Sequence, residues 1–463
     1  MKIALVYPRL FHQMHGLWAP LGIMLLGTIL RDAGHDITLL DASFDHDLSR
    51  INQEICIISP DIVAVSCSTD LMPNGEEILA AAKRNGYITV AGGPHPTIAP
   101  LETLRNPDID FVVLGEGELT FAELVRSIGN NTDPSGVNGI GFRQNGIPVV
   151  NPAREFINDL NSLPIPDREL LDTFPRYLQG LALNVSAIRG CPFRCTFCQP
   201  TLFHLFGKQI RSRSPENVVE ELELLYRRYR IRDFFFVDDL FTVSRVWLEQ
   251  FLDALKAAGL AGKIRFSINS RVDLINEEII LLLKAINTYY LLLGLESGSQ
   301  EMLDSCEKGT TVQQGIDAVN LARKHGIRIH AYILLGLPGE SVATLKATEK
   351  LLDTVRPDTV HISVATPFIG TDLFDQCKKV GRLQEGSHAA HDYYLDESAG
   401  NRPIAGLDYR EIYAARRRIL KGRRWRVMLS SALETLKDAV RERSLKKILF
   451  RAKMYRQMKH YFG

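Results

Sequence analysis

The stretch IRGCPFRCTFCQP, residues 188–200, places Cys191, Cys195 and Cys198 four and three residues apart in one short segment. The whole chain has seven cysteines. The odd number of cysteines and the absence of a secretory signal pattern argue against a disulfide framework. Metal binding or redox chemistry is therefore the expected role of this cysteine group. Three thiolates at this spacing can reach three corners of a cubane iron–sulfur cluster, whereas fully protein-ligated clusters use four cysteines. The spacing therefore predicts a four-iron cluster with one iron open to a substrate or cofactor.

Structural zinc, completed by His204, is the alternative reading of this loop. Zinc sites are typically built from two paired half-sites, and this chain shows only one. The remaining cysteines stand alone in the sequence: Cys56, Cys67, Cys306 and Cys377. The iron–sulfur reading is therefore favoured.

Six short apolar runs, alternating with helical patterns, surround the cysteine stretch. They predict strands over 181–188, 233–237, 263–270, 289–296, 327–336 and 358–366. Ser214 and Pro215 mark the start of one of the intervening helices. Six βα units are too few for a closed eight-fold barrel, but they fit an incomplete barrel with the same order of strands and helices. We therefore expect a partial (β/α)6 barrel of the TIM type.

The first 125 or so residues show a similar alternation, with strands expected over 2–8, 36–42, 61–68, 87–93 and 110–118. Near-continuous Val, Ile and Leu runs indicate a doubly wound parallel sheet, whose ligands bind at the carboxyl ends of strands. The dinucleotide signature G-x-G-x-x-G is absent after the first strand. The overall expectation is a Rossmann-like α/β domain (1–130), a linker (131–180), the partial barrel (181–385) and a basic helical region (386–463).

The motif CPFRCTFC, with Phe197 before the last cysteine, resembles that of radical S-adenosylmethionine enzymes over about residues 181–385. The resemblance implies that S-adenosylmethionine chelates the open iron and is cleaved to a radical that abstracts hydrogen from carbon. VDDLF (237–241) stands where the family often has Gly-Gly-Glu. The residues that the resemblance points to for this cofactor are Phe197, Asp238, Asp239, Asn269, Arg271 and Glu296.

The amino-terminal segments SCSTD, AGGPHPT and VVLGEGELTF, placed before such a barrel, resemble the cobalamin-binding domain of one large subclass of these enzymes. The residues expected at cobalamin are Ser66, Thr69, Gly92, Gly93, His95, Gly115, Glu116 and Gly117. The cobalt-ligating motif D-x-H-x-x-G is missing, so His46 is expected to be a surface residue. The resemblance thus implies cobalamin without a histidine below the cobalt.

Together these features predict an enzyme that methylates an unactivated carbon of a small-molecule or lipid-like substrate. Its cofactors would be a [4Fe-4S] cluster, S-adenosylmethionine and cobalamin, with electrons from a donor such as flavodoxin or ferredoxin. Ring closure or rearrangement without methyl transfer is the alternative reaction. A non-catalytic cobalamin sensor is the alternative class of protein.

The carboxyl-terminal tail concentrates positive charge. From Asp408 to Gly463 there are 17 Lys and Arg against 5 Asp and Glu, or +12, so a net charge of +1 leaves −11 for residues 1–407. Apolar residues at helical spacing, Ile419 and Trp425 among them, accompany this charge. Such helices can dock on the barrel or lie on an anionic membrane surface. No nucleic-acid partner is expected, because no binding module is evident. The expected location is the cytoplasm, with membrane association as an option.

Overall fold

The computed structural model describes residues 1–9, 18–45, 47–180, 182–198, 208–381, 383 and 406–422. The chain forms two compact units. The first comprises Met1–Tyr177, Gln199–Arg211 and Phe368–Gly370. The second comprises Leu178–Cys198, Ser212–Pro367 and Thr371–Gly463.

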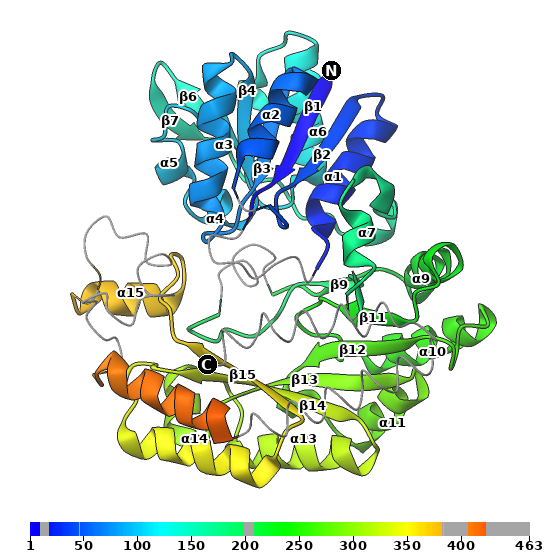
Figure 1. The fold of residues 1–463 in the computed structure, drawn as a ribbon, viewed down its shortest axis with the longest axis vertical. Coiled ribbons are helices and arrows are strands. Elements are labelled where there is room, and N and C mark those ends of the chain that lie inside the picture. The colour runs from blue at the N-terminus through cyan, green and yellow to red at the C-terminus, as the bar shows by residue number, and fades with distance from the viewer. Residues whose placement is uncertain are drawn as a thin grey trace. The chain divides into compact units, whose positions relative to one another are not determined.

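A seven-stranded sheet, in the order β2-β1-β3-β4-β5-β6-β7, forms the centre of the first unit as far as it is described (Figure 1). The strands are β1 (Lys2–Tyr7), β2 (Asp36–Asp41), β3 (Ile62–Ser66), β4 (Ile88–Gly92), β5 (Phe111–Val113), β6 (Ile140–Gln144) and β7 (Ile147–Val150). The first five are parallel, and β6 and β7 add an antiparallel hairpin. The doubly wound parallel sheet is therefore confirmed.

Helices cover both faces of this sheet, since α1 packs with α6 and α2 packs with α3. The helices and turns of this unit are α1 (Leu21–Asp32), α2 (Ser49–Ile58), α3 (Met72–Arg84), α4 (Pro94–Ile98), α5 (Pro100–Thr103), α6 (Gly117–Gly129), η1 (Pro134–Gly136), η2 (Leu160–Ser162), η3 (Arg168–Leu170) and α7 (Phe174–Tyr177). The fully buried Val63 and Val112 belong to the core between the sheet and its helices. Both sides of each central strand are thus withdrawn from water, as the continuous apolar runs predict.

Most of the segment expected as a linker, residues 131–177, belongs to the first unit, and residues 178–180 belong to the second. Asn145 and Gly146 join β6 to β7 with positive φ angles of 52° and 80°, which a two-residue hairpin turn requires. Further along, the buried carboxylate of Asp41 accepts hydrogen bonds from the hydroxyls of Thr173 (2.6 Å) and Tyr177 (2.8 Å). This stretch is therefore held by the sheet at both its ends.

A six-stranded parallel sheet, in the order β15-β14-β13-β12-β11-β8, forms the centre of the second unit, and Figure 1 shows it curling with helices on its outer side. Its strands are β8 (Leu183–Val185), β11 (Asp233–Phe236), β12 (Arg265–Ser270), β13 (Thr288–Glu296), β14 (Arg328–Leu335) and β15 (Thr359–Val364). The short strands β9 (Ile188–Arg189) and β10 (Arg211–Ser212) lie outside this sheet. The curled half-barrel sheet of six strands is confirmed.

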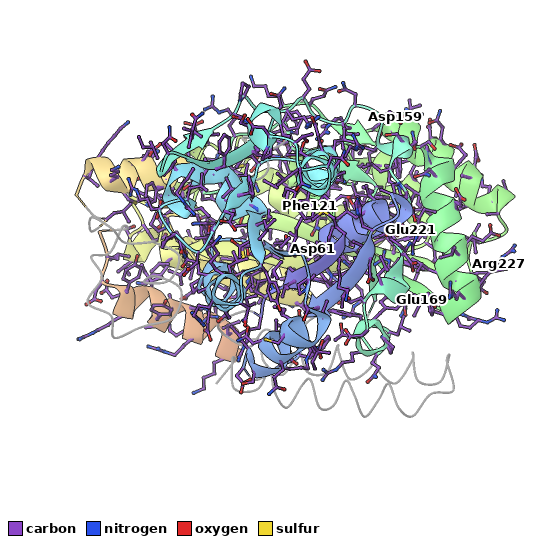
Figure 2. All side chains as sticks on the ribbon, turned by 90° about the horizontal axis from the view of Figure 1, so that it is seen from above. Asp61, Phe121, Asp159, Glu169, Glu221 and Arg227 are labelled. Carbon is purple, nitrogen blue, oxygen red and sulfur yellow. The ribbon has the colours of Figure 1, made fainter. Side chains whose placement is uncertain are left out.

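The helices of this unit follow the strands in order. They are α9 (Pro215–Tyr229), α10 (Arg245–Ala257), η4 (Val272–Leu274), α11 (Glu277–Ala285), α12 (Gln300–Ser305), α13 (Val312–Lys324), α14 (Val342–Val355) and α15 (Asp372–Lys379). Among them, α9 packs against α10, α10 against α11, and α13 against α14. The Ser214 hydroxyl caps α9 by accepting from the Asn217 amide at 3.2 Å, as predicted. On α9, Glu221 is buried and pairs with Arg213 at 2.5 Å, whereas Arg227 points outward to solvent (Figure 2).

Residues 409–422, the start of the basic tail, form a helix in the second unit. Ile412 and Ile419 are buried, and Arg416 donates to the carbonyl of Ile362 on β15 at 3.1 Å. This segment thus docks on the half-barrel, while the expectations for Trp425 and the rest of the tail lie outside the described residues. Among the helices that the structure describes, none is both long and apolar enough to cross a membrane.

Candidate functional site

The cysteine loop follows the first strand of the six-stranded sheet, β8, and contains no regular secondary structure from Gly190 to Cys198. Gly190 has φ 100°, a value that favours glycine and turns the chain at the start of the loop. Cys191 is 8% exposed, and Cys195 and Cys198 are partly exposed. The amide of Cys198 donates to the carbonyl of Cys195 at 2.9 Å, which forms a tight turn between them. Three thiols are thus presented by one turn at the carboxyl end of a strand.

Burial raises the pKa of Cys191 and, more strongly, that of Cys198. A raised pKa favours the protonated form of both thiols at neutral pH. Ligation requires the thiolate form, so a bound metal group must displace these protons and its affinity falls as the pH falls.

Phe197 lies beside a small apolar cluster rather than in solvent. The cluster contains the buried residues Cys306 and Leu334, and the amide of Thr196 donates to the Cys306 carbonyl at 3.0 Å. Cys306, isolated in the sequence, therefore lies next to the cysteine loop. Burial raises the pKa of Cys306 to about 12, which keeps it a neutral thiol in the core.

The two acidic residues after β11 differ in their surroundings. The Asp238 carboxylate is 3% exposed and accepts from the Ser186 hydroxyl (2.7 Å) and the Ala187 amide (3.0 Å), just before the cysteine loop. Burial raises the pKa of Asp238 to about 6 despite these donors. Asp239 is exposed. Asp238 thus fixes the start of the loop, and Asp239 is the carboxylate that a ligand can reach.

Asn269 and Arg271 lie on either side of the end of β12. The side-chain amide of Asn269 donates to the backbone carbonyl of Asp238 at 3.1 Å, and the backbone carbonyl of Asn269 accepts from the Phe241 amide at 3.1 Å. Arg271 is 5% exposed, and its guanidinium donates to the carbonyl of Lys308 at 2.6 Å. The structure therefore brings the ends of β11 and β12 together near the cysteine loop.

Glu296, at the end of β13, pairs with a residue that the sequence did not single out. Its carboxylate accepts from the Lys308 ammonium at 2.7 Å, and both side chains are buried. Burial opposes the charge of Lys308, but the Glu296 carboxylate outweighs it and raises the pKa of Lys308. Glu296 itself has a φ of 58°, an uncommon backbone state for a residue other than glycine.

We expect Lys308→Met to lower the free energy of unfolding by about 3 kcal/mol, because a lone buried Glu296 carboxylate is left without its counter-ion. The double variant Glu296→Gln/Lys308→Met should recover much of this loss. Arg245→Met, which breaks the exposed pair with Glu278, is the control and should have little effect. Urea denaturation followed by tryptophan fluorescence measures all three. Equal losses in the single and double variants would contradict the pairing.

The donor set of the loop consists of sulfur alone, which suits the irons of an iron–sulfur cluster. Within the described ranges, no group of three or more His, Cys, Asp or Glu side chains could hold one metal ion. In a cubane cluster each thiolate binds a different iron. His204, the fourth ligand of the zinc alternative, lies outside the described residues.

In the first unit, the ends of β3 and β4 meet at the carboxyl edge of the sheet. The amide of Cys67 donates to the Gly92 carbonyl at 2.8 Å, and the amide of His95 donates to the Cys67 carbonyl at 3.0 Å. Gly93 has φ 95°, and a Cβ there would lie 2.9 Å from the backbone nitrogen of Cys67. Ser66 is close by, with its hydroxyl oxygen 3.2 Å from the same Cβ position. Only glycine therefore allows this close approach of the two strand ends.

Thr69 and His95 come together at this edge, with the Thr69 hydroxyl 3.2 Å from Nδ1 of His95. His95 is 3% exposed. The pair therefore fixes the His95 ring against the loop after β3.

Gly115, Glu116 and Gly117 follow β5, and they differ in character. The Gly115 amide donates to the Thr97 hydroxyl at 3.0 Å, and a Cβ at Gly115 would meet nothing within 4 Å. Glu116 is buried and accepts from Arg211 (2.7 Å) and from the Ile157 amide (2.8 Å). Gly115 leaves open space at the edge, a Cβ at Gly117 would contact Leu26 and Val113 at 3.6 Å, and the Glu116 carboxylate is engaged inside the unit.

This bare, glycine-lined edge fits a large flat ligand, because backbone without side chains can approach a ring or its nucleotide tail closely. His46, expected at the surface rather than at cobalt, lies outside the described residues.

The inner face of the second sheet carries a band of aromatic and histidine side chains. Tyr332 and His361 are paired across β14 and β15 with ring centroids 6.1 Å apart. The His330 ring lies 4.7 Å from Tyr332, and burial lowers the pKa of His330 to about 3. His330 is therefore neutral at physiological pH, and the band is rich in hydrogen-bonding groups.

Comparison with known proteins gives two family matches. Residues 10–125 match the B12 binding domain, and residues 185–352 match the Radical SAM superfamily. The chain is 35% identical to an uncharacterized methyltransferase of Pyrococcus horikoshii, over 77% of this chain and 78% of that one. It is 31% identical to the anaerobic magnesium-protoporphyrin IX monomethyl ester cyclase of Rubrivivax gelatinosus, over 81% of this chain and 70% of that one.

Among solved structures, the chain resembles the radical S-adenosylmethionine methyltransferase TsrM of Kitasatospora setae, with tryptophan and a cofactor analogue bound. The TM-score is 0.71 at 22% identity, covering 83% of this chain and 77% of TsrM. At this identity the likeness supports the fold alone, which is a Rossmann-like domain followed by a half-barrel.

Proposed function

Because this chain belongs to the cobalamin-dependent branch of the radical S-adenosylmethionine superfamily, we propose that it methylates an unactivated carbon of a small-molecule or lipid-like substrate. The protein is an enzyme whose cofactors are a [4Fe-4S] cluster, S-adenosylmethionine and cobalamin. The observation that carries the proposal is the turn that presents three thiols beside the ends of β11, β12 and β13.

Cys191, Cys195 and Cys198 are the proposed cluster ligands, one for each of three irons. Their support is the shared turn and the hydrogen bond between the backbones of Cys195 and Cys198. Phe197 packs against the apolar cluster around Cys306 and anchors the turn from beneath. The loop can therefore keep its shape while the thiols change from the protonated to the ligating state.

The residues proposed for S-adenosylmethionine are those at the strand ends nearest the turn. Asp239 is exposed and can accept from an ammonium group, whereas Asp238 is engaged with the loop. Asn269 presents an amide group, and Glu296 with Lys308 supplies a paired carboxylate and ammonium. Lys308 adds a cation suited to the methionyl carboxylate, a role that the sequence alone did not suggest.

For cobalamin, the support lies in the carboxyl edge of the first sheet. Gly115 leaves open space for a ring or its nucleotide tail, and Gly92 and Gly117 place no side chain at this edge. Gly93 lets the ends of β3 and β4 approach each other, and Ser66 and Thr69 offer hydroxyls. His95 positions Thr69, and Glu116 braces the β5 loop through Arg211. In this proposal Glu116 holds the loop after β5 in place and does not itself contact cobalamin.

When bound, the cluster and S-adenosylmethionine supply a hydrogen-abstracting radical, and cobalamin supplies the methyl group. The residues of the chain bind and orient the cofactors and the substrate and shield them from water. Tyr332 and His361 on the inner face of the second sheet are suited to hydrogen-bond an uncharged part of the substrate. A one-electron carrier such as flavodoxin or ferredoxin is the proposed reductant.

We expect S-adenosylmethionine labelled in its methyl group to transfer the label to product at one methyl per turnover. Mass spectrometry of the product made by the anaerobically reconstituted full chain, with an extract fraction as the source of substrate, measures the transfer. The Cys198→Ala variant is the control for label that moves without the cluster.

The relative named as a cyclase makes ring closure the competing reaction. Ring closure consumes S-adenosylmethionine but leaves no methyl label in the product. Product formation with 5′-deoxyadenosine and no label would therefore contradict methyl transfer and leave the cofactors intact.

A further inference from the structure

Arg271 immediately follows β12, and the structure places its guanidinium within the protein rather than at an open surface. Only 5% of the residue is exposed. Its Nε donates to Asp273 at 3.0 Å, and its Nη2 donates to the Lys308 carbonyl at 2.6 Å. These contacts fix both the position and the plane of the guanidinium.

The guanidinium also touches the cysteine loop at two points. Its Nη1 donates to Sγ of Cys195 at 3.5 Å. The Arg271 Cζ lies 3.6 Å from the centroid of the Phe193 ring, two residues earlier in the loop. Arg271 therefore joins the end of β12 to the middle of the loop through one sulfur and one aromatic face.

We propose that Arg271 is a positioning residue for the iron–sulfur cluster, which holds Cys195 and raises the reduction potential of the cluster through the N–H to sulfur hydrogen bond. The inference rests on the proposed ligation by Cys195. It differs from the expectation that Arg271 contacts S-adenosylmethionine, because the guanidinium contacts Asp273, Lys308, Cys195 and Phe193.

The direction of the effect follows from charge. Reduction adds one electron from a low-potential one-electron donor, and part of that charge resides on the ligand sulfurs. A fixed cation and a donated hydrogen bond at one sulfur stabilise the reduced state more than the oxidised state. Burial strengthens both interactions, because little water screens them.

The test is a redox titration of the anaerobically reconstituted full chain, monitored by the electron paramagnetic resonance signal of the reduced cluster. With Arg271→Gln we expect the ratio of reduced to oxidised cluster at a fixed potential to fall about tenfold, which for a one-electron couple is a shift of about 59 mV to lower potential. Arg271→Lys keeps the positive charge but loses the planar guanidinium, so the reduction potential of its cluster should lie between those of the wild type and Arg271→Gln.

Arg265, the first residue of β12, supplies a matched control. It pairs with Asp233 and lies over the Tyr289 ring, at the opposite end of β12 from the cysteine loop. Arg265→Gln removes a largely buried arginine of the same strand and should leave the potential unchanged. An equal shift in this control would assign the effect to general loosening of the sheet and overturn the inference.

The remaining outcomes separate this inference from the proposed function. If the wild-type chain binds no cluster, the proposed function fails. If the cluster loads and Arg271→Gln and Arg271→Lys both keep the wild-type potential, only the inference fails. Weaker binding of S-adenosylmethionine at an unchanged reduction potential would indicate that Arg271 contacts S-adenosylmethionine, and would contradict the inference. If Arg271→Gln loses iron, the reduction potential of Arg271→Lys is the test: a value below that of the wild type supports the inference, and an unchanged value contradicts it.

Discussion

Cys198→Ala is expected to abolish both the brown absorbance of the reconstituted protein and the cleavage of S-adenosylmethionine. Cubane clusters at three-cysteine sites already have one iron without a protein ligand, and loss of Cys198 leaves two irons open. The remaining thiols of Cys191 and Cys195 are too few to hold the cluster against exchange with solvent. We expect iron below about a tenth of the wild-type content, and 5′-deoxyadenosine production lowered at least about 100-fold, equivalent to about 2.7 kcal/mol or more in activation free energy.

The structure offers two matched controls for this substitution. Cys306 and Cys377 are buried in the apolar cluster that contacts Phe197, and each can be changed to alanine with the same loss of volume. Both variants should keep four irons, because these thiols are held in the core rather than presented by the turn. Four irons in Cys198→Ala, or iron loss in Cys306→Ala, would contradict the ligand assignment. Stoichiometric zinc without iron in the wild-type protein would contradict the cluster itself.

The strands of both sheets could be predicted from the sequence because each is a short, nearly continuous apolar run. Buried parallel strands need such runs, and helices rarely show them at that length. The hairpin of β6 and β7 was missed, since Pro148 and the polar residues around it read as linker. Its turn residues, Asn145 and Gly146, are the one local signal that could have revealed it.

The candidate site shows the same division between local and distant information. Cysteine spacing is local, so the turn that presents the three thiols is readable from the motif. The distinct surroundings of Asp238 and Asp239 depend on Ser186, about fifty positions earlier in the chain, and no local pattern contains that contact. Glu116 likewise meets Arg211 across 95 positions. Sequence reasoning can name such residues but not say which of them is already engaged.

Lys308 was missed for a related reason. It lies twelve residues after Glu296, and the short helix α12 between them folds the chain back so that the two side chains meet. A single lysine in a loop has no spacing to recognise. The pairing of Lys308 with Glu296, and the contact of Arg271 with Cys195, arise only when the loops after β12 and β13 are built.

The second large effect is expected in the first unit, where Gly93→Ala should weaken binding of hydroxocobalamin at least about tenfold, or 1.4 kcal/mol. Gly93 has φ 95°, and the added Cβ would lie 2.9 Å from both the backbone nitrogen and oxygen of Cys67. The ends of β3 and β4 must then move apart, and these ends form the proposed cobalamin edge. Equilibrium dialysis of the full-length protein measures the change.

Gly86→Ala separates this effect from backbone strain alone. Gly86 also has a positive φ, of 83°, but it precedes β4 at the opposite edge of the sheet and a Cβ there would meet nothing within 4 Å. Both substitutions cost backbone strain, of roughly 1–2 kcal/mol, yet only Gly93→Ala should lose cobalamin. Gly92→Leu adds a test from the ligand side, because the first atom of its side chain has only ordinary contacts, the nearest at 3.7 Å. Equal binding by all three variants and the wild type would remove this edge from the cobalamin site, and retention of no cobalamin by the wild-type chain would remove the methyl donor from the proposed reaction.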